Sequence, residues 1–156
     1  MYIHLYVMTK PYTPSLPCMC ASFRRASRAL TQLYDEAMRP TGIKGTQFTV
    51  LQALSLAGKV SQRELGQILA IDSTTLTRTL EIMGRRGWVA KEPGKDRREW
   101  RLRLTRAGES QFKRALPSWE EVQSRLRSQL GSDRWEKLLS LTNIVTSMVA
   151  DSGDDS

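Results

Sequence analysis

The sequence predicts a mainly α-helical fold that carries one small β-hairpin. Apolar residues recur every three or four positions through most of residues 16–150, which is the period of helices that bury one face. Only residues 88–104 depart from that period, where apolar and polar side chains alternate on either side of a polar turn. Glycines, prolines and capping residues separate the helical segments from one another.

The first helix is expected over residues 16–37. Its apolar positions follow a heptad-like period from Leu16 to Ala37, and Pro40 and Gly42 end it. Residues 1–14 are expected to form an irregular arm, because prolines interrupt regular structure there. A long helix at the start of a small domain is either an ordinary core helix or a surface that packs against a second copy.

Three shorter helices follow. The first is expected to begin with Thr46 as its cap and to close at Gly58. Ser61 and Glu64 form a capping box for the second, which stops near residue 70. The third opens at residue 72 or 73, buries one face at helical spacing, and ends near Gly87.

The hairpin is expected from residues 88–92 and 99–104, joined by a polar turn. Trp100, Leu102 and Leu104 share one side of the second strand and arginines take the other. The tip carries Lys95, Arg97 and Arg98. This segment therefore predicts a hairpin with a basic tip and one basic face.

Two further helical stripes complete the chain. One is expected to bend at Pro117, Gly131 separates it from the last helix, and residues 151–156 form an acidic tail. We expect a single domain over residues 15–150. Its DNA-binding lobe would occupy residues 46–105, and the helices of residues 15–40 and 106–150 would form a dimerisation region from both termini.

Charge distribution favours an anionic partner. The formal net charge is +8, and residues 59–106 hold twelve basic and six acidic side chains, which is six of those eight charges. A general solubility coat would not concentrate the charge in this way. Nucleic acid is the leading candidate for a small basic protein.

Two short helices followed by a basic hairpin make up a winged helix-turn-helix. A helix fits the major groove of B-DNA, where base edges present distinct donors and acceptors. The second short helix offers Ser73, Thr75, Thr77 and Arg78, and Thr74 also points away from its buried face. The hairpin tip could enter the adjacent minor groove, whose negative potential favours arginine. Taken singly, the Ser/Thr run could be only a helix start and the hairpin only a charged edge strand.

The residues that carry this pattern also resemble a known family. Matching segments are Thr46-Gln47-Phe48, Ser61-Gln62-Arg63-Glu64-Leu65, residues 72–78, 86–89, 96–98 and 102–108, and Leu116-Pro117-Ser118-Trp119. Together they resemble the MarR family of bacterial transcriptional regulators over roughly residues 16–150. The resemblance implies a homodimer whose terminal helices interlock, and two lobes that bind double-stranded DNA at a pseudo-palindromic operator. It implies release by a small-molecule or redox signal, with repression as the usual mode. It adds Ser61 and Gln62 to the DNA-binding residues, and it assigns Arg98 to DNA and Asp96 to fixing the wing.

Cys20 is a candidate sensor. The stretch from Cys20 to Tyr34 is similar to the organic-hydroperoxide-sensing branch of that family, where a tyrosine matching Tyr34 can contact the sensing cysteine. The chain has Gly45 where that branch has a second tyrosine. Oxidation of Cys20 is therefore one hypothesis, a buried structural cysteine is another, and binding of an aromatic acid near Arg24 or Arg28 is a third.

Other classes of function have less support. The chain has one histidine, His4, in the irregular arm, and two cysteines, Cys18 and Cys20, with no partners for a zinc set. It has no glycine-rich phosphate loop, so we expect no enzyme, no cofactor and no metal. No apolar run is long enough for a membrane span, and the start is a poor signal peptide, so we expect a cytoplasmic protein. A non-specific architectural DNA binder remains the alternative.

Overall fold

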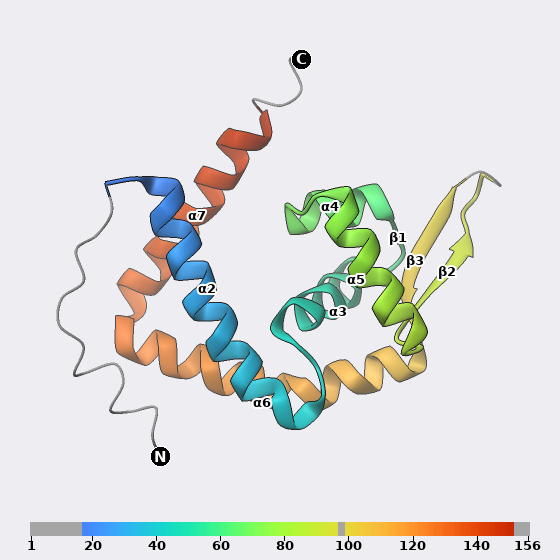
Figure 1. Cartoon of the computed structure of the whole chain (residues 1–156), viewed down its shortest axis with the longest axis horizontal. Coiled ribbons are helices and arrows are strands. Elements are labelled where there is room, and N and C mark those ends of the chain that lie inside the picture. Colours follow the sequence, from blue (N-terminus) through green and yellow to red (C-terminus); the bar gives the residue numbers. More distant parts are fainter. Residues whose placement is uncertain (1–16, 97–98, 152–156) are drawn as a thin grey trace. The chain divides into compact units, whose positions relative to one another are not determined.

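The computed structural model describes residues 17–96 and 99–151. The helices and strands follow one another as α2 (Met19–Met38), the 3₁₀ helix η1 (Arg39–Thr41), α3 (Gly45–Ala57), β1 (Val60–Ser61), α4 (Gln62–Leu69), α5 (Ser73–Arg85), β2 (Val89–Pro93), β3 (Trp100–Leu104), α6 (Arg106–Leu130) and α7 (Ser132–Asp151) (Figure 1). The predicted fold class, mainly helical with one hairpin, is confirmed. Among these described helices, none is both long and apolar enough to cross a membrane.

Two compact units divide the chain between Gln32 and Leu33. In the first unit, α2 begins two residues after Pro17, and its side chains up to Gln32 are mostly exposed. The second unit begins with the last turn of α2 and contains every later element.

The core of the second unit lies around α3, which contacts α4, α6 and β3. Phe48 of α3 is almost fully buried, and its ring lies 5.2 Å from that of Phe112 and 5.8 Å from that of Trp119 on α6. The other elements contribute buried aliphatic side chains to the same core: Leu65 of α4, Leu76 and Met83 of α5, and Leu102 of β3. These are the positions that the helical and strand periods predicted to be buried.

A three-stranded antiparallel sheet replaces the simple hairpin that the sequence predicted. Its order is β1-β3-β2, with Val60 opposite Leu102 and Ser61 opposite Arg101. Two residues are too few for an alternating pattern, so β1 left no signal in the sequence. Because α4 begins directly after β1, this pairing attaches the start of α4 to the hairpin.

The start of α3 corrects one expectation. Thr46 is not the cap, because the helix begins at Gly45 and the cap position is Lys44. Gln47 accepts the N–H of Lys44 at 3.1 Å, and the carboxylate of Asp35 accepts the N–H of Gly45 at 2.7 Å. Asp35, ten residues before Gly45, therefore accepts an N–H that a side chain at the cap position would ordinarily accept.

Candidate nucleic-acid interface

The first of the two short helices, α4, is capped as its sequence predicts. The Ser61 hydroxyl accepts the N–H of Glu64 at 3.1 Å, and the Glu64 carboxylate accepts the N–H of Ser61 at 2.6 Å. The hydrogen bond from the Ser61 backbone is the main reason why the pKa of Glu64 lies below its ordinary value. Ser61 therefore orients the start of α4, and its predicted contact with DNA stays a prediction.

The second short helix, α5, is capped by Asp72. The Asp72 carboxylate accepts the backbone N–H of Thr75 at 2.9 Å and its hydroxyl at 2.6 Å. Both bonds favour the ionised acid, so the pKa of Asp72 is lowered, most of all by the hydroxyl. The Thr75 hydroxyl is thus already engaged inside the molecule.

The residues predicted to face DNA divide into two groups on α5. Ser73, Thr74 and Arg78 are exposed, and Arg78 makes no ion pair within the part of the chain that the structure describes. Thr77 is half-buried instead, because it faces α4. Its hydroxyl donates to the carbonyl of Ser73 at 2.8 Å and accepts from the Gln62 amide nitrogen at 2.7 Å.

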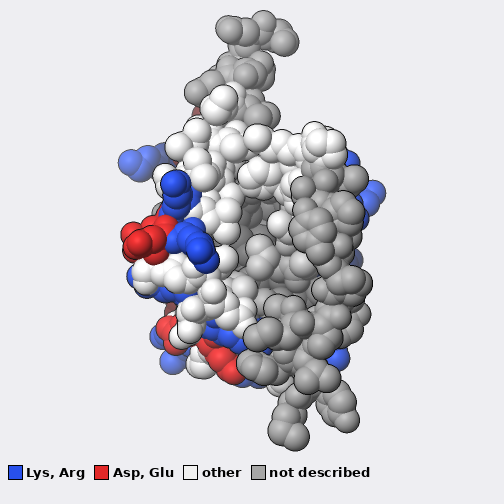
Figure 2. All heavy atoms as spheres, turned by 90° about the vertical axis from the view of Figure 1, so that its left-hand side faces the viewer, with Lys and Arg blue, Asp and Glu red and all other residues white. Residues whose placement is uncertain are grey.

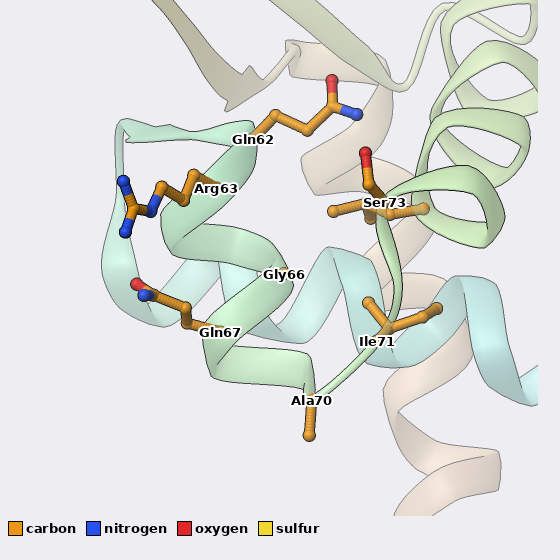
Figure 3. A pocket seen from close by; sticks show the side chains of 8 residues that line it. Gln62, Arg63, Gly66, Gln67, Ala70, Ile71 and Ser73 are labelled. Carbon is orange, nitrogen blue, oxygen red and sulfur yellow. The ribbon is translucent and has the colours of Figure 1, made fainter. Parts of the chain in front are cut away.

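A groove of about 520 Å³ runs between α4 and α5 (Figure 3). The α4 side carries Gln62, Arg63 and Gln67, and the opposite side is formed by the turn and the start of α5, including Ser73. Gly66 lines its floor, where an added Cβ would lie 3.5 Å from the carbonyl of Ile71. The two helices therefore approach closely at the turn, and the Gln62–Thr77 hydrogen bond joins them at the start of α4.

The strands of the wing place cationic side chains on one face, as predicted, but these charges are paired. Arg101 contacts Glu64 at 2.8 Å and Glu99 at 2.7 Å. Glu92 accepts Arg103 at 2.7 Å and also pairs with Lys59. Pairing with these two cations, Lys59 foremost, lowers the pKa of Glu92. The outer face of the wing is therefore less positive than its sequence indicates.

At the tip of the wing, Lys95 and Asp96 are exposed. The turn is closed by backbone hydrogen bonds from Gly94 to Glu99 at 2.7 Å and from Glu99 to Asp96 at 2.9 Å. Arg97 and Arg98, which were predicted to contact DNA, lie outside the described residues. Lys91 was not among the predicted site residues, although it is exposed on the wing face opposite the paired arginines.

The candidate sensor residues fall in both units. Cys20 lies in the first turn of α2 and is a free thiol that is exposed in the single chain, as is Cys18 before the helix. A buried structural role for Cys20 therefore stays an alternative that requires a partner chain. Arg24 and Arg28 are exposed on the same helix. Tyr34 belongs to the second unit.

Tyr34 is half-buried there, and its hydroxyl accepts from the amide of Gln123 on α6 at 2.8 Å. Burial raises its pKa, and the bond from Gln123 opposes part of that rise. A Cβ at Gly45 would lie 3.2 Å from the Cβ of Tyr34. A side chain at position 45 would therefore start in tight contact with Tyr34 and would require a shift of a few tenths of an ångström.

Comparison with known proteins agrees with this geometry. A family model described as "MarR family" matches residues 41–99. The transcriptional regulator MosR of M. tuberculosis, solved in complex with DNA, is 35% identical, with a TM-score of 0.78 over 86% of this chain and 98% of its own. The chain belongs to the MarR family.

Two further relatives have lower sequence identity. A mutant MarR from E. coli, solved with operator DNA, is 25% identical, with a TM-score of 0.73 over 81% of this chain and 92% of its own. The uncharacterised HTH-type transcriptional regulator YwoH of Bacillus subtilis is 30% identical over 88 residues. That match covers 56% of this chain and spans 64% of YwoH, so it includes only part of that relative.

Proposed function

We propose that this MarR-family protein is a sequence-specific transcriptional regulator. It binds double-stranded DNA as a homodimer and represses from a pseudo-palindromic operator in the bacterial cytoplasm. A small-molecule or redox signal releases it.

One observation carries this proposal: α5 presents an exposed polar face at its start, and the same helix contacts β2 of the wing. Ser73, Thr74 and Arg78 stand free of the core, while Leu76 and Leu80 hold the opposite face of the helix in it. Small hydroxyl side chains permit a close approach to base edges, and Arg78 can bond a guanine edge through two N–H groups. The DNA-bound structures of MosR and of mutant MarR, both similar to this chain, support the same use of the fold.

The proposed roles of the site residues follow from this placement. Ser73, Thr74 and Arg78 contact the major groove, with Thr75, Thr77, Ser61 and Gln62 around them. Lys95, Arg97 and Arg98 reach the adjacent minor groove or its phosphates, and Asp96 fixes the tip of the wing. In a two-fold dimer, the two lobes must meet DNA about 34 Å apart, which is one helical turn.

The test compares operator DNA with random DNA at one salt concentration. A regulator should prefer its operator by roughly a thousandfold or more, whereas an architectural binder should show little preference and a steep salt dependence. DNase I protection of the intergenic DNA beside its own gene would supply the operator. Equal affinity for both duplexes would contradict sequence-specific regulation.

Two variants separate the proposed roles. Arg78→Ala should lose about tenfold or more of the operator preference, because a bidentate base contact discriminates by about 1–3 kcal/mol. Arg98→Ala should weaken binding to operator and random DNA alike and flatten the salt dependence. If both variants affect the two duplexes equally, the assigned roles are wrong.

The signal has two candidates, and the exposed thiol of Cys20 favours oxidation. Its conversion to a sulfenic acid by an organic hydroperoxide, followed by a disulfide with a second thiol, would change the start of α2. Treatment of the reduced protein with the hydroperoxide should then lower operator affinity, and Cys20→Ser should resist. If the wild type keeps full affinity, a ligand near Arg24 or Arg28 becomes the better hypothesis.

A further inference from the structure

A second hollow, of about 300 Å³, lies between the wing and the start of α4 and is named here the wing hollow. It is lined by Gln62, Lys91, Trp100 and Leu102. Lys91 pairs with Leu102 across the two strands, and Trp100 is two residues from Leu102, so these three side chains share one face of the hairpin. Gln62, the first residue of α4, closes the other side.

The charge in the wing hollow is uncompensated. Lys59, Arg101 and Arg103 are neutralised by Glu64, Glu92 and Glu99, and none of these carboxylates lines the hollow. Lys91 makes no ion pair within residues 17–96 and 99–151. Trp100 is 57% exposed and Leu102 is buried, so the ammonium group stands beside apolar surface, where attraction to an anion is less screened than in open water.

The Gln62 amide is oriented by Thr77. The Thr77 hydroxyl gives its single proton to the Ser73 carbonyl, so toward Gln62 it can only accept. The amide nitrogen of Gln62 must therefore face Thr77. Its second N–H makes no other hydrogen bond in the described part of the chain and remains available as a donor at the hollow.

We propose that the wing hollow binds a phosphate of the DNA backbone. The inference rests on the proposed function. The hollow lies between the wing and the start of α4, whose Gln62 bonds Thr77 of α5, so a backbone strand that separates the groove entered by α5 from the groove reached by the wing would pass beside it. Lys91 supplies the charge, Gln62 supplies an oriented N–H, and Thr77 acts as a positioning residue and not as a base contact. Such contacts set the register of the protein on the duplex.

The experiment uses operator duplexes in which single phosphates are replaced, one at a time, by uncharged methylphosphonates. At one position in each half-site, the replacement should weaken the wild type by about tenfold, as expected for losing a hydrogen bond to a charged group. Lys91→Gln should weaken the unmodified operator by a similar factor and reduce the salt slope by about one per lobe. At that same position, the methylphosphonate should weaken Lys91→Gln no further.

The matched control is Lys59→Gln, because Lys59 is already paired with Glu92. This variant should keep most of the salt slope and should remain sensitive to the methylphosphonate. If Lys91→Gln leaves the slope unchanged, or responds to every methylphosphonate as the wild type does, the phosphate site is wrong. A wild type that binds no duplex DNA overturns the proposed function as well, whereas these other failures overturn the phosphate site alone.

Thr77 provides an independent arm of the test. Thr77→Val keeps the shape but removes the acceptor, so it should weaken operator binding without changing base preference, and Thr77→Ser should restore the binding. In a Gln62→Ala background, Thr77→Val should have no further effect. If Thr77→Val alters the preferred bases, Thr77 is a base contact and its positioning role is wrong.

Discussion

At the scale of single residues, Gly108 shows how closely two segments can meet. It lies in the first turn of α6, where its N–H donates to the Thr105 hydroxyl at 3.0 Å and Thr105 in turn donates its N–H to the Trp88 carbonyl at 3.0 Å. A Cβ at Gly108 would lie 2.1 Å from the Trp88 carbonyl oxygen. The start of α6 is therefore attached to the connection between α5 and β2, at a point that only glycine can occupy.

Gly108→Ala should lower the free energy of unfolding by about 3 kcal/mol or more, because backbone must move to admit the methyl group. Gly84→Ala is the control, since the nearest atom to its Cβ would be the Val89 carbonyl oxygen at 4.0 Å. It should leave stability unchanged or raise it by up to about 1 kcal/mol. Urea unfolding of both variants measures the difference, and similar midpoints would contradict the close approach.

Asp72 makes a pH-dependent contribution to the stability of the fold. Hydrogen bonds from Thr75 lower its pKa in the folded state. Its contribution is present above the ordinary carboxyl pKa of about 4 and is lost as the pH falls through the lower, folded-state value. Asp72→Asn keeps a capping oxygen but cannot titrate, so its melting temperature should fall less than that of the wild type on acidification below about pH 4. If the melting temperatures of the two proteins fall equally as the pH is lowered, Asp72 makes no such contribution.

At the scale of elements, α3 is held to α6 by aromatic packing. The rings of Phe112 and Trp119 pack against Phe48, which is 1% exposed. Because α3 also contacts α4 and β3, and α6 also contacts β3, this packing supports the first short helix and the wing.

Phe48→Ala should destabilise the fold by about 3–5 kcal/mol, since it leaves a cavity in the core. Leu56→Ala, on the same helix, should change stability by no more than about 0.5 kcal/mol, because Leu56 is 84% exposed. Denaturant unfolding followed by tryptophan fluorescence measures both. A small effect of Phe48→Ala would mean that the α3–α6 contact is not a main source of stability.

At the scale of the whole molecule, α7 carries several large apolar side chains that are exposed in the described part of the chain. Its exposed side chains include Leu138, Leu139, Leu141, Ile144 and Met148. Figure 2 shows the left-hand side of Figure 1, where part of the described surface is uncharged and basic and acidic side chains lie mainly around its margins. A face of this kind is typical of an interface between proteins, and it supports the homodimer proposed above.

Ile144→Asp should convert the dimer into a monomer, since it places a charge in that face. Operator affinity should then fall by more than about tenfold, because each lobe binds alone. Leu56→Asp is the control: it adds the same charge at an exposed site on α3 and should leave both properties unchanged. Analytical ultracentrifugation measures the mass of each variant, and fluorescence anisotropy measures its operator affinity. If Ile144→Asp remains a dimer, another surface forms the interface.

Local patterns in the sequence were sufficient for much of the fold. The helical periods, the Ser61–Glu64 capping box and the alternation from Trp100 to Leu104 each involve residues a few positions apart, and the structure has all of them. The exposed residues of α5 could be predicted for the same reason, because a helical period determines which face is buried. Membership of the MarR family was also evident from contiguous segments.

Only the tertiary structure decided which polar groups are available for binding. The arginines of the wing strands are paired with Glu64 and Glu92, α3 is capped by Asp35, and Thr77 is engaged by Gln62 fifteen residues earlier. A charge or a hydroxyl is equally visible in a sequence whether or not it has a partner. Partners distant along the chain follow no period, so only folding brings them together and leaves Lys91 without an ionic partner among the described residues.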